Sequence, residues 1–168
     1  TLTRILETWG LLSPPALTLP TVAADVEPTT FDPTAEAMGQ GELLVTPLQM
    51  AGAVAVLGND GLRPPLQLLL SPLEGCSSPS DEAIGGDRVI DAATAERIRQ
   101  NLPRYDDAAG YLGTSLAGLE RQQAWFIGLN SPSLPRYGVV VFLDHADRPE
   151  RAAQIGTELL RWVPDIQR

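Results

Sequence analysis

Residues 38–61 read MGQGELLVTPLQMAGAVAVLGNDG and are the segment from which the architecture of this chain is most readily inferred. The segment has the features of a helix with well-defined ends. Thr46 suits the N-cap, Pro47 the first helical position and Gln49 the third position of a capping box. The Asn-Asp-Gly sequence at 59–61 tolerates left-handed backbone conformations, which favours a helix end there. The sequence therefore predicts a helix over residues 47–58.

This predicted helix carries no charged residue on any side. Its larger apolar side chains, Leu48, Met50, Val54, Val56 and Leu57, are distributed all around the helix axis. A helix that is apolar on every side is normally buried on every side. We therefore expect it to be a central element surrounded by other structure.

The composition limits the chemistry that the chain can perform. Its 168 residues with 43% hydrophobic content suffice for a single domain with a core. The formal net charge of −9 excludes nucleic acid as a partner, because nucleic-acid binding needs basic patches. All 12 basic residues are arginines. The absence of lysine excludes a P-loop phosphate site and a Schiff-base mechanism.

The order of three short motifs resembles one protein family. Gly-Gln-Gly stands at 39–41, Thr-Pro-Leu-Gln at 46–49 and Asn-Asp-Gly at 59–61. This order is similar to the segment that follows the Ser-x-Asn loop in the transpeptidase domains of penicillin-binding proteins. A buried helix with a proline at its start would explain the second motif but not the first.

The C-terminal part of the chain extends the resemblance. Strand patterns at 108–115, 122–129 and 137–143 are followed by a helical pattern over 149–163, and the family domain ends with the same order of elements. The continuous apolar run at 137–143 is typical of a strand buried on both faces. We expect an α/β fold of the α+β type, in which an antiparallel sheet of about three main strands has flanking helices. It would resemble the C-terminal part of the β-lactamase and transpeptidase-like fold.

The resemblance covers nearly the whole chain, so residues 1–168 are expected to form a single, partial transpeptidase-like domain. Residues 1–37 would be an irregular N-terminal segment with a short helix near its start. Residues 38–107 would be the helical part, with a second helix at 91–101. Residues 108–168 would hold the three strands and the final helix. A chain that opens at Thr1 is expected to be a processed or excised product.

The nucleophile expected of this family is missing from the chain. In the family motif Ser-x-x-Lys, the lysine can take the proton from the serine hydroxyl. A chain without lysine cannot contain this motif, and none of its serines lies in a Ser-x-Asn sequence. We therefore expect no catalytic residue in this chain.

The third family motif, Lys-Thr/Ser-Gly-Thr, is present in a degenerate form. Tyr111 stands at the lysine position and Leu112 at the hydroxyl position, whereas Gly113 and Thr114 are retained. The resemblance implies that the lysine and the hydroxyl bind a substrate carboxylate. Leucine cannot donate a hydrogen bond and tyrosine carries no positive charge, so anion recognition should be largely lost. A tyrosine general base remains an alternative, but it would need a neighbouring cation, and the sequence places none beside Tyr111.

Two other polar candidates are weaker. Cys76 lies alone in a Ser/Pro-rich segment, which is more typical of a surface loop than of a catalytic nucleophile. His145, within Asp-His-Ala-Asp at 144–147, could contribute to a weak metal site or simply belong to a polar loop. We favour the loop, and we expect neither a metal nor a cofactor.

Two functions remain open. The first is a non-catalytic transpeptidase-like domain that serves as a scaffold or binding module in cell-wall assembly, with peptidoglycan or an assembly protein as its partner. The second is the C-terminal portion of an active serine D,D-transpeptidase whose nucleophile lies upstream. The degenerate motif favours the first. The resemblance implies an extracytoplasmic parent in the cell envelope, anchored by an N-terminal membrane helix that this chain does not contain. The strand at 137–143 is also expected to be covered at its edge, by a second copy of the chain or by its own N-terminal segment.

Overall fold

A computed structural model of the chain describes residues 2–17, 19–23, 32–38, 41–68, 86–117 and 121–166. Within these ranges five helices flank one four-stranded sheet. Residues 39 and 40 of the Gly-Gln-Gly motif and Cys76 lie outside the described residues, so the structure does not test expectations that rest on them. None of the helices within the described ranges is long and apolar enough to span a membrane.

The sheet is antiparallel throughout and has the strand order β1-β2-β3-β4. Its three main strands are β2 (Ala108–Ala117), β3 (Arg121–Leu129) and β4 (Gly138–Leu143). The short strand β1 (Arg104–Tyr105) adds to the outer edge of β2. The α+β fold with three main strands is therefore confirmed, and β1 is an addition too short to be recognised in the sequence.

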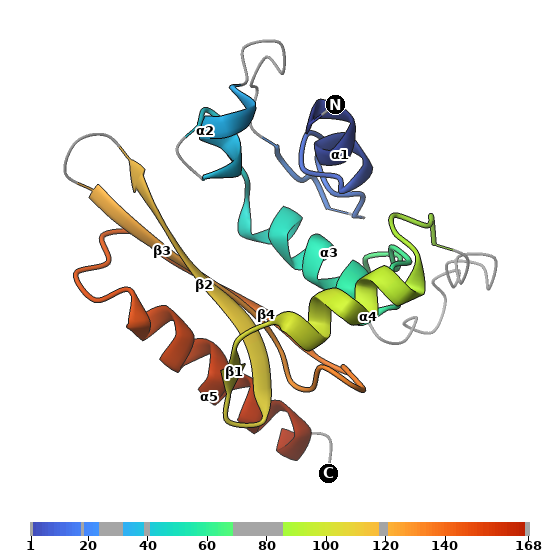
Figure 1. Cartoon of the computed structure of the whole chain (residues 1–168), viewed down its shortest axis with the longest axis vertical. Coiled ribbons are helices and arrows are strands. Elements are labelled where there is room, and N and C mark those ends of the chain that lie inside the picture. The colour runs from blue at the N-terminus through green and yellow to red at the C-terminus, as the bar shows by residue number, and fades with distance from the viewer. Residues whose placement is uncertain are drawn as a thin grey trace.

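One face of the sheet is covered by α5 (Glu150–Ile166), the final helix (Figure 1). The centre of this layer is Phe126, which is fully buried and makes an edge-to-face contact with Tyr105 at 5.3 Å between ring centroids. Glycines make room for the Phe126 ring: a Cβ added at Gly110, Gly128 or Gly156 would lie within 2.3–2.7 Å of a ring atom. These glycines are therefore required by packing.

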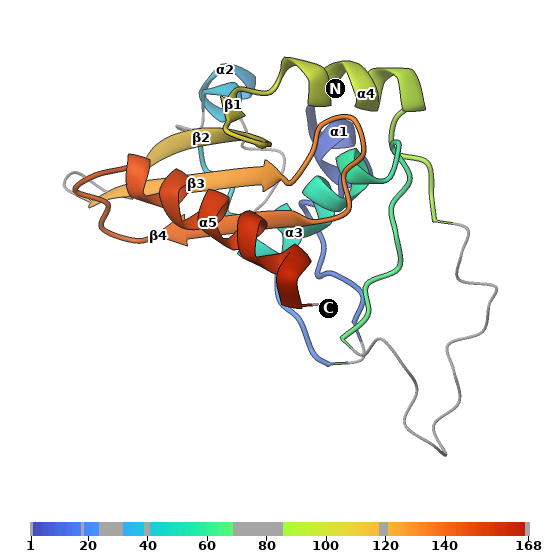
Figure 2. The ribbon, with the colours of Figure 1, turned by 90° about the horizontal axis from the view of Figure 1, so that it is seen from below.

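The opposite face is partly covered by α3 (Pro47–Gly58), and Figure 1 shows the sheet between α5 and α3. Seen from below, α5 lies in front of the sheet (Figure 2). The predicted capping box is confirmed. The Thr46 hydroxyl accepts the Gln49 backbone N–H at 3.2 Å, and the Gln49 side-chain oxygen accepts the Thr46 backbone N–H at 2.8 Å. The helix ends at Asn59, and Gly61 follows with φ +82°. The helix boundaries predicted from the sequence are confirmed.

The expectation that α3 is buried on every side is wrong. Val54, Val56 and Leu57 are buried, but Leu48 is 36% exposed and the small residues between them are only half-buried. The reason is that the described elements cover α3 from two directions only, the sheet and α4 (Ala92–Asn101). Its remaining side lies along the irregular segments at 9–16 and 63–66.

The expectation that the last strand is buried on both faces is also wrong. Only Val141 of β4 is buried, and its neighbours are half-buried or exposed. β4 is the terminal strand of the described sheet, and no described N-terminal residue pairs with it. Within the described residues this apolar run is therefore an edge strand, paired on one side only.

The helices outside the sheet layers are short. The predicted helix near the N-terminus is α1 (Leu2–Thr8), and the helix predicted at 91–101 is α4 (Ala92–Asn101), with Asp91 as its N-cap. A further helix, α2 (Pro33–Ala37), lies in the segment expected to be irregular. It is capped by Asp32, whose carboxylate accepts the Thr34 backbone N–H at 2.9 Å.

Candidate functional site

The degenerate motif lies in the middle of β2, and its first residue faces away from α5. Tyr111 pairs with Ile127 of β3, whose side chain is on the α3 side of the sheet. The Tyr111 side chain is 57% exposed. A Cβ added at Gly113 would lie 3.4 Å from the ring atom Cε1 of Tyr111, so the ring leans along the strand toward Gly113. Tyr111 is therefore an accessible surface residue.

The second residue of the motif has a different environment. Leu112 pairs with Phe126 and packs against the buried cluster beneath α5. Successive side chains of a strand point to opposite faces, so the lysine and hydroxyl positions of the motif cannot share one surface here. Leu112 is half-buried against this cluster, whereas Tyr111 is exposed on the other face.

The retained residues preserve the strand itself. Thr114 is exposed and pairs with Ala124, and Gly113 pairs with Trp125. Gly110, just before the motif, is required because an added Cβ would lie 2.4 Å from the carbonyl oxygen of Ile127. The backbone of the motif strand is thus intact, although two of its four side chains have changed chemistry. Loss of anion recognition at this strand stays a prediction.

A row of polar side chains crosses the sheet next to the motif. The Ser115 hydroxyl donates to Gln123 Oε1 at 3.2 Å, and Gln123 Nε2 donates to Asp144 Oδ1 at 3.3 Å. Arg121 forms an ion pair with the same carboxylate. The hydrogen bond from Gln123, followed by the interactions with Arg121 and His145, lowers the pKa of Asp144 below its ordinary value. Asp144 is therefore a stable anion at neutral pH, and the hydrogen-bond partner that the described residues provide for the Ser115 hydroxyl is a glutamine amide, which is not a base.

His145 lies at the end of this row, with Nδ1 3.4 Å from Asp144 Oδ2. It has φ +64° and a side chain that is 66% exposed. Within the described ranges no group of three or more histidine, cysteine or acidic side chains lies close enough together to hold a metal ion. The residues at 144–147 form a polar loop between β4 and α5.

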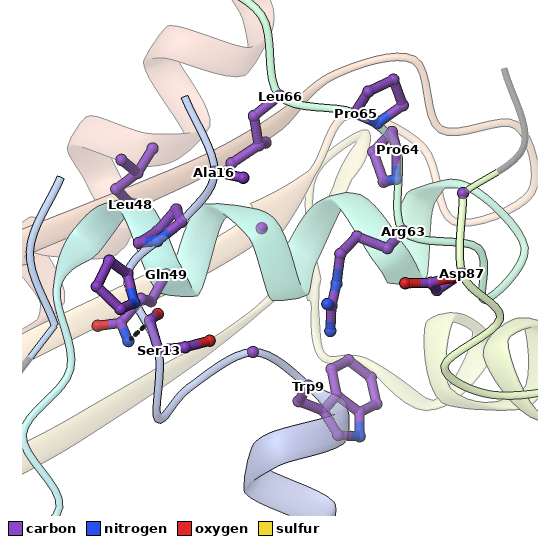
Figure 3. Close-up of a pocket in the computed structure, with 15 residues that line it drawn as sticks. Trp9, Ser13, Ala16, Leu48, Gln49, Arg63, Pro64, Pro65, Leu66 and Asp87 are labelled. Atoms are coloured by element: carbon purple, nitrogen blue, oxygen red, sulfur yellow. Dashed lines mark hydrogen bonds between the residues drawn. The ribbon is translucent and has the colours of Figure 1, made fainter. Parts of the chain in front are cut away.

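A pocket of about 490 Å³ lies on the far side of α3 from the sheet (Figure 3). Its walls come from the end of α1, the prolines at 14–15 and 64–65, and one side of α3. The side-chain amide of Gln49, which is 2% exposed, donates to the carbonyl oxygens of Leu11 at 2.9 Å and Ser13 at 3.2 Å. Arg63 donates to the carbonyl oxygen of Thr8. None of the fifteen lining residues belongs to the motif strand, so this pocket is separate from the motif.

The sequence pattern did not reveal two polar residues that hold the helical part together. Gln49 is recognisable as a capping residue but not as the anchor of the N-terminal segment. Arg99 of α4 is 4% exposed and donates to the carbonyl oxygens of Leu57 at 2.6 Å and Pro132 at 3.0 Å, and to the Asp60 carboxylate at 2.9 Å. The available signal was its position one helical turn after Ala95, on the buried face of α4.

Comparison with known proteins agrees with this geometry. The family model described as the penicillin binding protein transpeptidase domain matches residues 1–161. No curated protein matches the chain.

Several solved structures share the fold. The chain is similar to the D,D-transpeptidase domain of a peptidoglycan glycosyltransferase from Eggerthella lenta, with TM-score 0.74, 20% identity, and coverage of 99% of this chain and 48% of that one. A peptidoglycan glycosyltransferase from Burkholderia ambifaria gives TM-score 0.69 and 22% identity, with 97% of this chain and 56% of that chain covered. Penicillin-binding protein A from M. tuberculosis, in an imipenem acyl-enzyme complex, gives TM-score 0.71 and 23% identity, with 94% and 40% covered.

The chain therefore spans about half the length of the solved structures that it matches. At these identities the structures show a common fold. The family model covers all but the last residues of the chain and includes α1, the capped helix α3, the motif strand and most of α5. The chain belongs to the penicillin-binding protein transpeptidase domain family.

Proposed function

We propose that this chain is a non-catalytic, transpeptidase-like part of a peptidoglycan synthesis protein, which serves as a scaffold or binding module in cell-wall assembly. The observation that carries the proposal is the pair Tyr111 and Leu112 at the positions of the family's lysine and hydroxyl. Tyr111 supplies no positive charge and Leu112 packs into the core. Tyr111 offers a neutral hydroxyl in place of a cation and Leu112 offers no donor, so charge-based binding of a substrate carboxylate is lost at these two positions.

The described residues near the motif offer no replacement for the missing lysine of Ser-x-x-Lys. Without lysine it cannot form a Ser-x-x-Lys nucleophile. Within the described ranges the serine nearest the motif, Ser115, donates to a glutamine and not to a base. Among the described residues, Ser115 therefore has no contact with the base that a serine nucleophile needs.

Labelling with a fluorescent penicillin tests the catalytic half of the proposal. We expect no label on the chain after a denaturing gel, whereas a penicillin-binding protein with an intact Ser-x-x-Lys, run in parallel, should be labelled. A covalent, serine-linked label on this chain would refute the proposal.

Co-sedimentation with purified peptidoglycan tests the binding half. We expect the chain to sediment with the polymer, with bovine serum albumin as an acidic control that stays in solution. If penicillin did not label the chain and the chain also failed to sediment, peptidoglycan would be rejected as the partner, while the non-catalytic assignment would stand. A cell-wall assembly protein would then be the partner class to test.

A second function is favoured by the intact backbone of the motif. Gly113 and Thr114 are retained, and β2 keeps an unbroken register with β3 from Ala109 to Ala117. These features suit the C-terminal portion of an active serine D,D-transpeptidase whose nucleophile lies upstream and which tolerates Tyr111. A serine-linked penicillin label on a longer protein that contains this chain would support this second function.

The proposed role places the protein outside the cytoplasm, in the cell envelope. Family membership supports this location, since the similar structures are named as peptidoglycan glycosyltransferases and penicillin-binding proteins. Fractionation of cells that express a tagged parent protein, with a cytoplasmic enzyme as the marker, tests the location. Recovery of the tag with the cytoplasmic marker would contradict it.

A further inference from the structure

The short strand β1 places a positive charge on the same face of the sheet as the first residue of the degenerate motif. Arg104 of β1 pairs with Ala109 of β2, and directly opposed residues of an antiparallel pair point to the same face. Ala109 pairs in turn with Leu129, which packs in the cluster beneath α3. Tyr111 is two residues after Ala109 on β2, so Arg104 and Tyr111 both lie on the α3 face.

Arg104 is a diagonal neighbour of Tyr111 across the two strands. Diagonal neighbours on one face of an antiparallel pair lie about 7–8 Å apart, which is within reach of a long side chain. The Tyr111 ring leans toward Gly113, which is the direction away from Arg104. The guanidinium group therefore lies near the motif and is not covered by the tyrosine ring.

The Arg104 side chain is available for a ligand. It is exposed, and it forms no hydrogen bond or ion pair with any other residue that the structure describes. Asp106, in the turn that follows β1, pairs with Arg161 of α5 instead. A guanidinium group presents a planar fork of donors that matches a carboxylate. In a chain with a net charge of −9, such a local cation is needed to hold an anion.

The backbone of β2 offers a hydrogen-bond donor at the same edge. The Gly110 N–H points outward from the sheet and donates to the carbonyl oxygen of Pro103 at 3.0 Å. Alternate residues of an antiparallel strand direct their N–H groups to the same edge, so the Leu112 N–H also points outward. The pairing of β1 covers only Ala108 and Ala109, and none of the described backbone groups accepts the Leu112 N–H.

We propose that Arg104 supplies the positive charge that Tyr111 lacks, and that it forms, with the Leu112 N–H, a site for the free carboxylate at the C-terminal end of a peptide. This inference rests on the binding half of the proposed function and names the chemical group that is recognised. It also makes Arg104 the residue that determines specificity at this strand.

The direction of the strands explains why the ligand is a chain end. A peptide that pairs antiparallel with β2 runs in the same direction as β1, so its C-terminal end meets Pro103, where the chain enters β1. β1 blocks any longer strand from continuing along this edge. The last residue of the peptide then lies opposite Leu112, with its carboxylate beside Arg104. Charge complementarity therefore favours a free carboxylate over an internal segment.

Arg104 also has a possible structural role that the experiment must separate from binding. It lies two residues after Leu102, the C-cap of α4, and a cation near the C-terminal end of a helix is stabilising. Loss of that role would lower the unfolding midpoint and leave peptide binding unchanged. Loss of the proposed role would weaken peptide binding.

Nuclear magnetic resonance titration of the isotope-labelled chain tests the site, at about 20 mM salt so that the charge interaction is not screened. The probe is N-acetyl-D-Ala-D-Ala, because one of the similar structures is a D,D-transpeptidase domain. The same peptide with a C-terminal amide is its control. We expect the Leu112 amide and Arg104 Nε–H signals to shift with the free acid, and the amide to bind about tenfold more weakly or worse.

Two variants of Arg104 test the charge itself. Arg104→Gln should weaken binding of the free acid by about tenfold or more, because it removes the cation. Arg104→Lys keeps the charge and should retain part of the affinity. Arg97→Gln removes the same charge at an exposed position of α4 and should bind as the wild type does. The unfolding midpoint of each variant is recorded beside its affinity.

Equal binding of the free acid and the amide by the wild type would overturn the inference without the use of any variant. Wild-type affinity in Arg104→Gln would overturn it too, and a lowered unfolding midpoint in that variant would then assign Arg104 to the end of α4. If the chain sediments with peptidoglycan but does not respond to the free acid, this inference alone is overturned and the proposed function stands.

Discussion

Restoring the family residues at the degenerate motif should have unequal effects at two neighbouring positions. Tyr111→Lys changes an exposed side chain on the open face of β2, whereas Leu112→Thr removes an apolar side chain from the cluster beneath α5. The first change should be tolerated and the second should lower the free energy of unfolding. The double variant should lose about as much stability as Leu112→Thr alone.

The magnitude follows from the burial of each side chain. Complete burial of a leucine stabilises a protein by about 1.5–3 kcal/mol, and Leu112 is half-buried, so its lost contacts cost about 1–1.5 kcal/mol. A threonine hydroxyl facing the same cluster adds up to about 1 kcal/mol if water reaches it poorly. We therefore expect Leu112→Thr to cost about 1–2.5 kcal/mol. Tyr111→Lys should stay within about 0.5 kcal/mol.

Urea unfolding followed by tryptophan fluorescence measures these differences. Leu112→Met, which conserves volume, is the control and should cost less than about 1 kcal/mol. The reasoning is refuted if Leu112→Thr changes the free energy of unfolding by no more than Tyr111→Lys does. The double variant should also stay unlabelled by fluorescent penicillin, because neither substitution supplies the Ser-x-x-Lys nucleophile that acylation needs.

Three further changes test the packing and charge interactions. Arg99→Ala should lower the free energy of unfolding by about 2–4 kcal/mol in urea, because it leaves two buried carbonyl oxygens without their charged donor. Arg97→Ala, on the exposed side of α4, should lower it by less than about 0.5 kcal/mol. Equal effects of the two variants would contradict the role of Arg99. Gly156→Ala places a Cβ 2.3 Å from Phe126 Cδ1, so it should lower the free energy of unfolding by about 1–2 kcal/mol although alanine has the better helix propensity. A variant more stable than the wild type would show that the Phe126 ring can move. Hydrogen bonds from Thr94, in the first turn of α4, lower the pKa of the Asp91 carboxyl below its ordinary value of 3.8. The ionised carboxylate therefore stabilises the folded state above pH 3.8, and this stabilisation is lost as the pH falls through the lower pKa of the folded state. Asp91→Ala should therefore lower the melting temperature at pH 7 but have little effect near pH 2, and an effect that does not depend on pH would rule out this linkage.

Local sequence signals predicted the regular elements well. The capping box of α3, the helix at 91–101 and the three main strands depend on residues within a few positions of each other, so the sequence contains the necessary information. The two-residue strand β1 and the five-residue helix α2 were missed, because elements this short have no hydrophobic periodicity.

Burial was predicted less well than secondary structure. The apolar runs in α3 and β4 indicated complete burial, but burial depends on which other elements are present to cover them. β4 has a strand on one side only within the described ranges, and α3 is covered from two directions. The composition of a helix or strand does not show which other elements cover it.

The sequence by itself determined the chemical limits of this protein. A chain without lysine cannot contain Ser-x-x-Lys, and the family resemblance places Tyr111 and Leu112 at the lysine and hydroxyl positions of the strand motif, an assignment that stays a prediction. The tertiary structure alone decided what these substitutions do, because the alternation of β2 exposes Tyr111 and buries Leu112 against Phe126. It also decided the role of Arg99, whose three acceptors lie 33 to 42 residues away and become neighbours only when α3, α4 and the loop before β4 pack together.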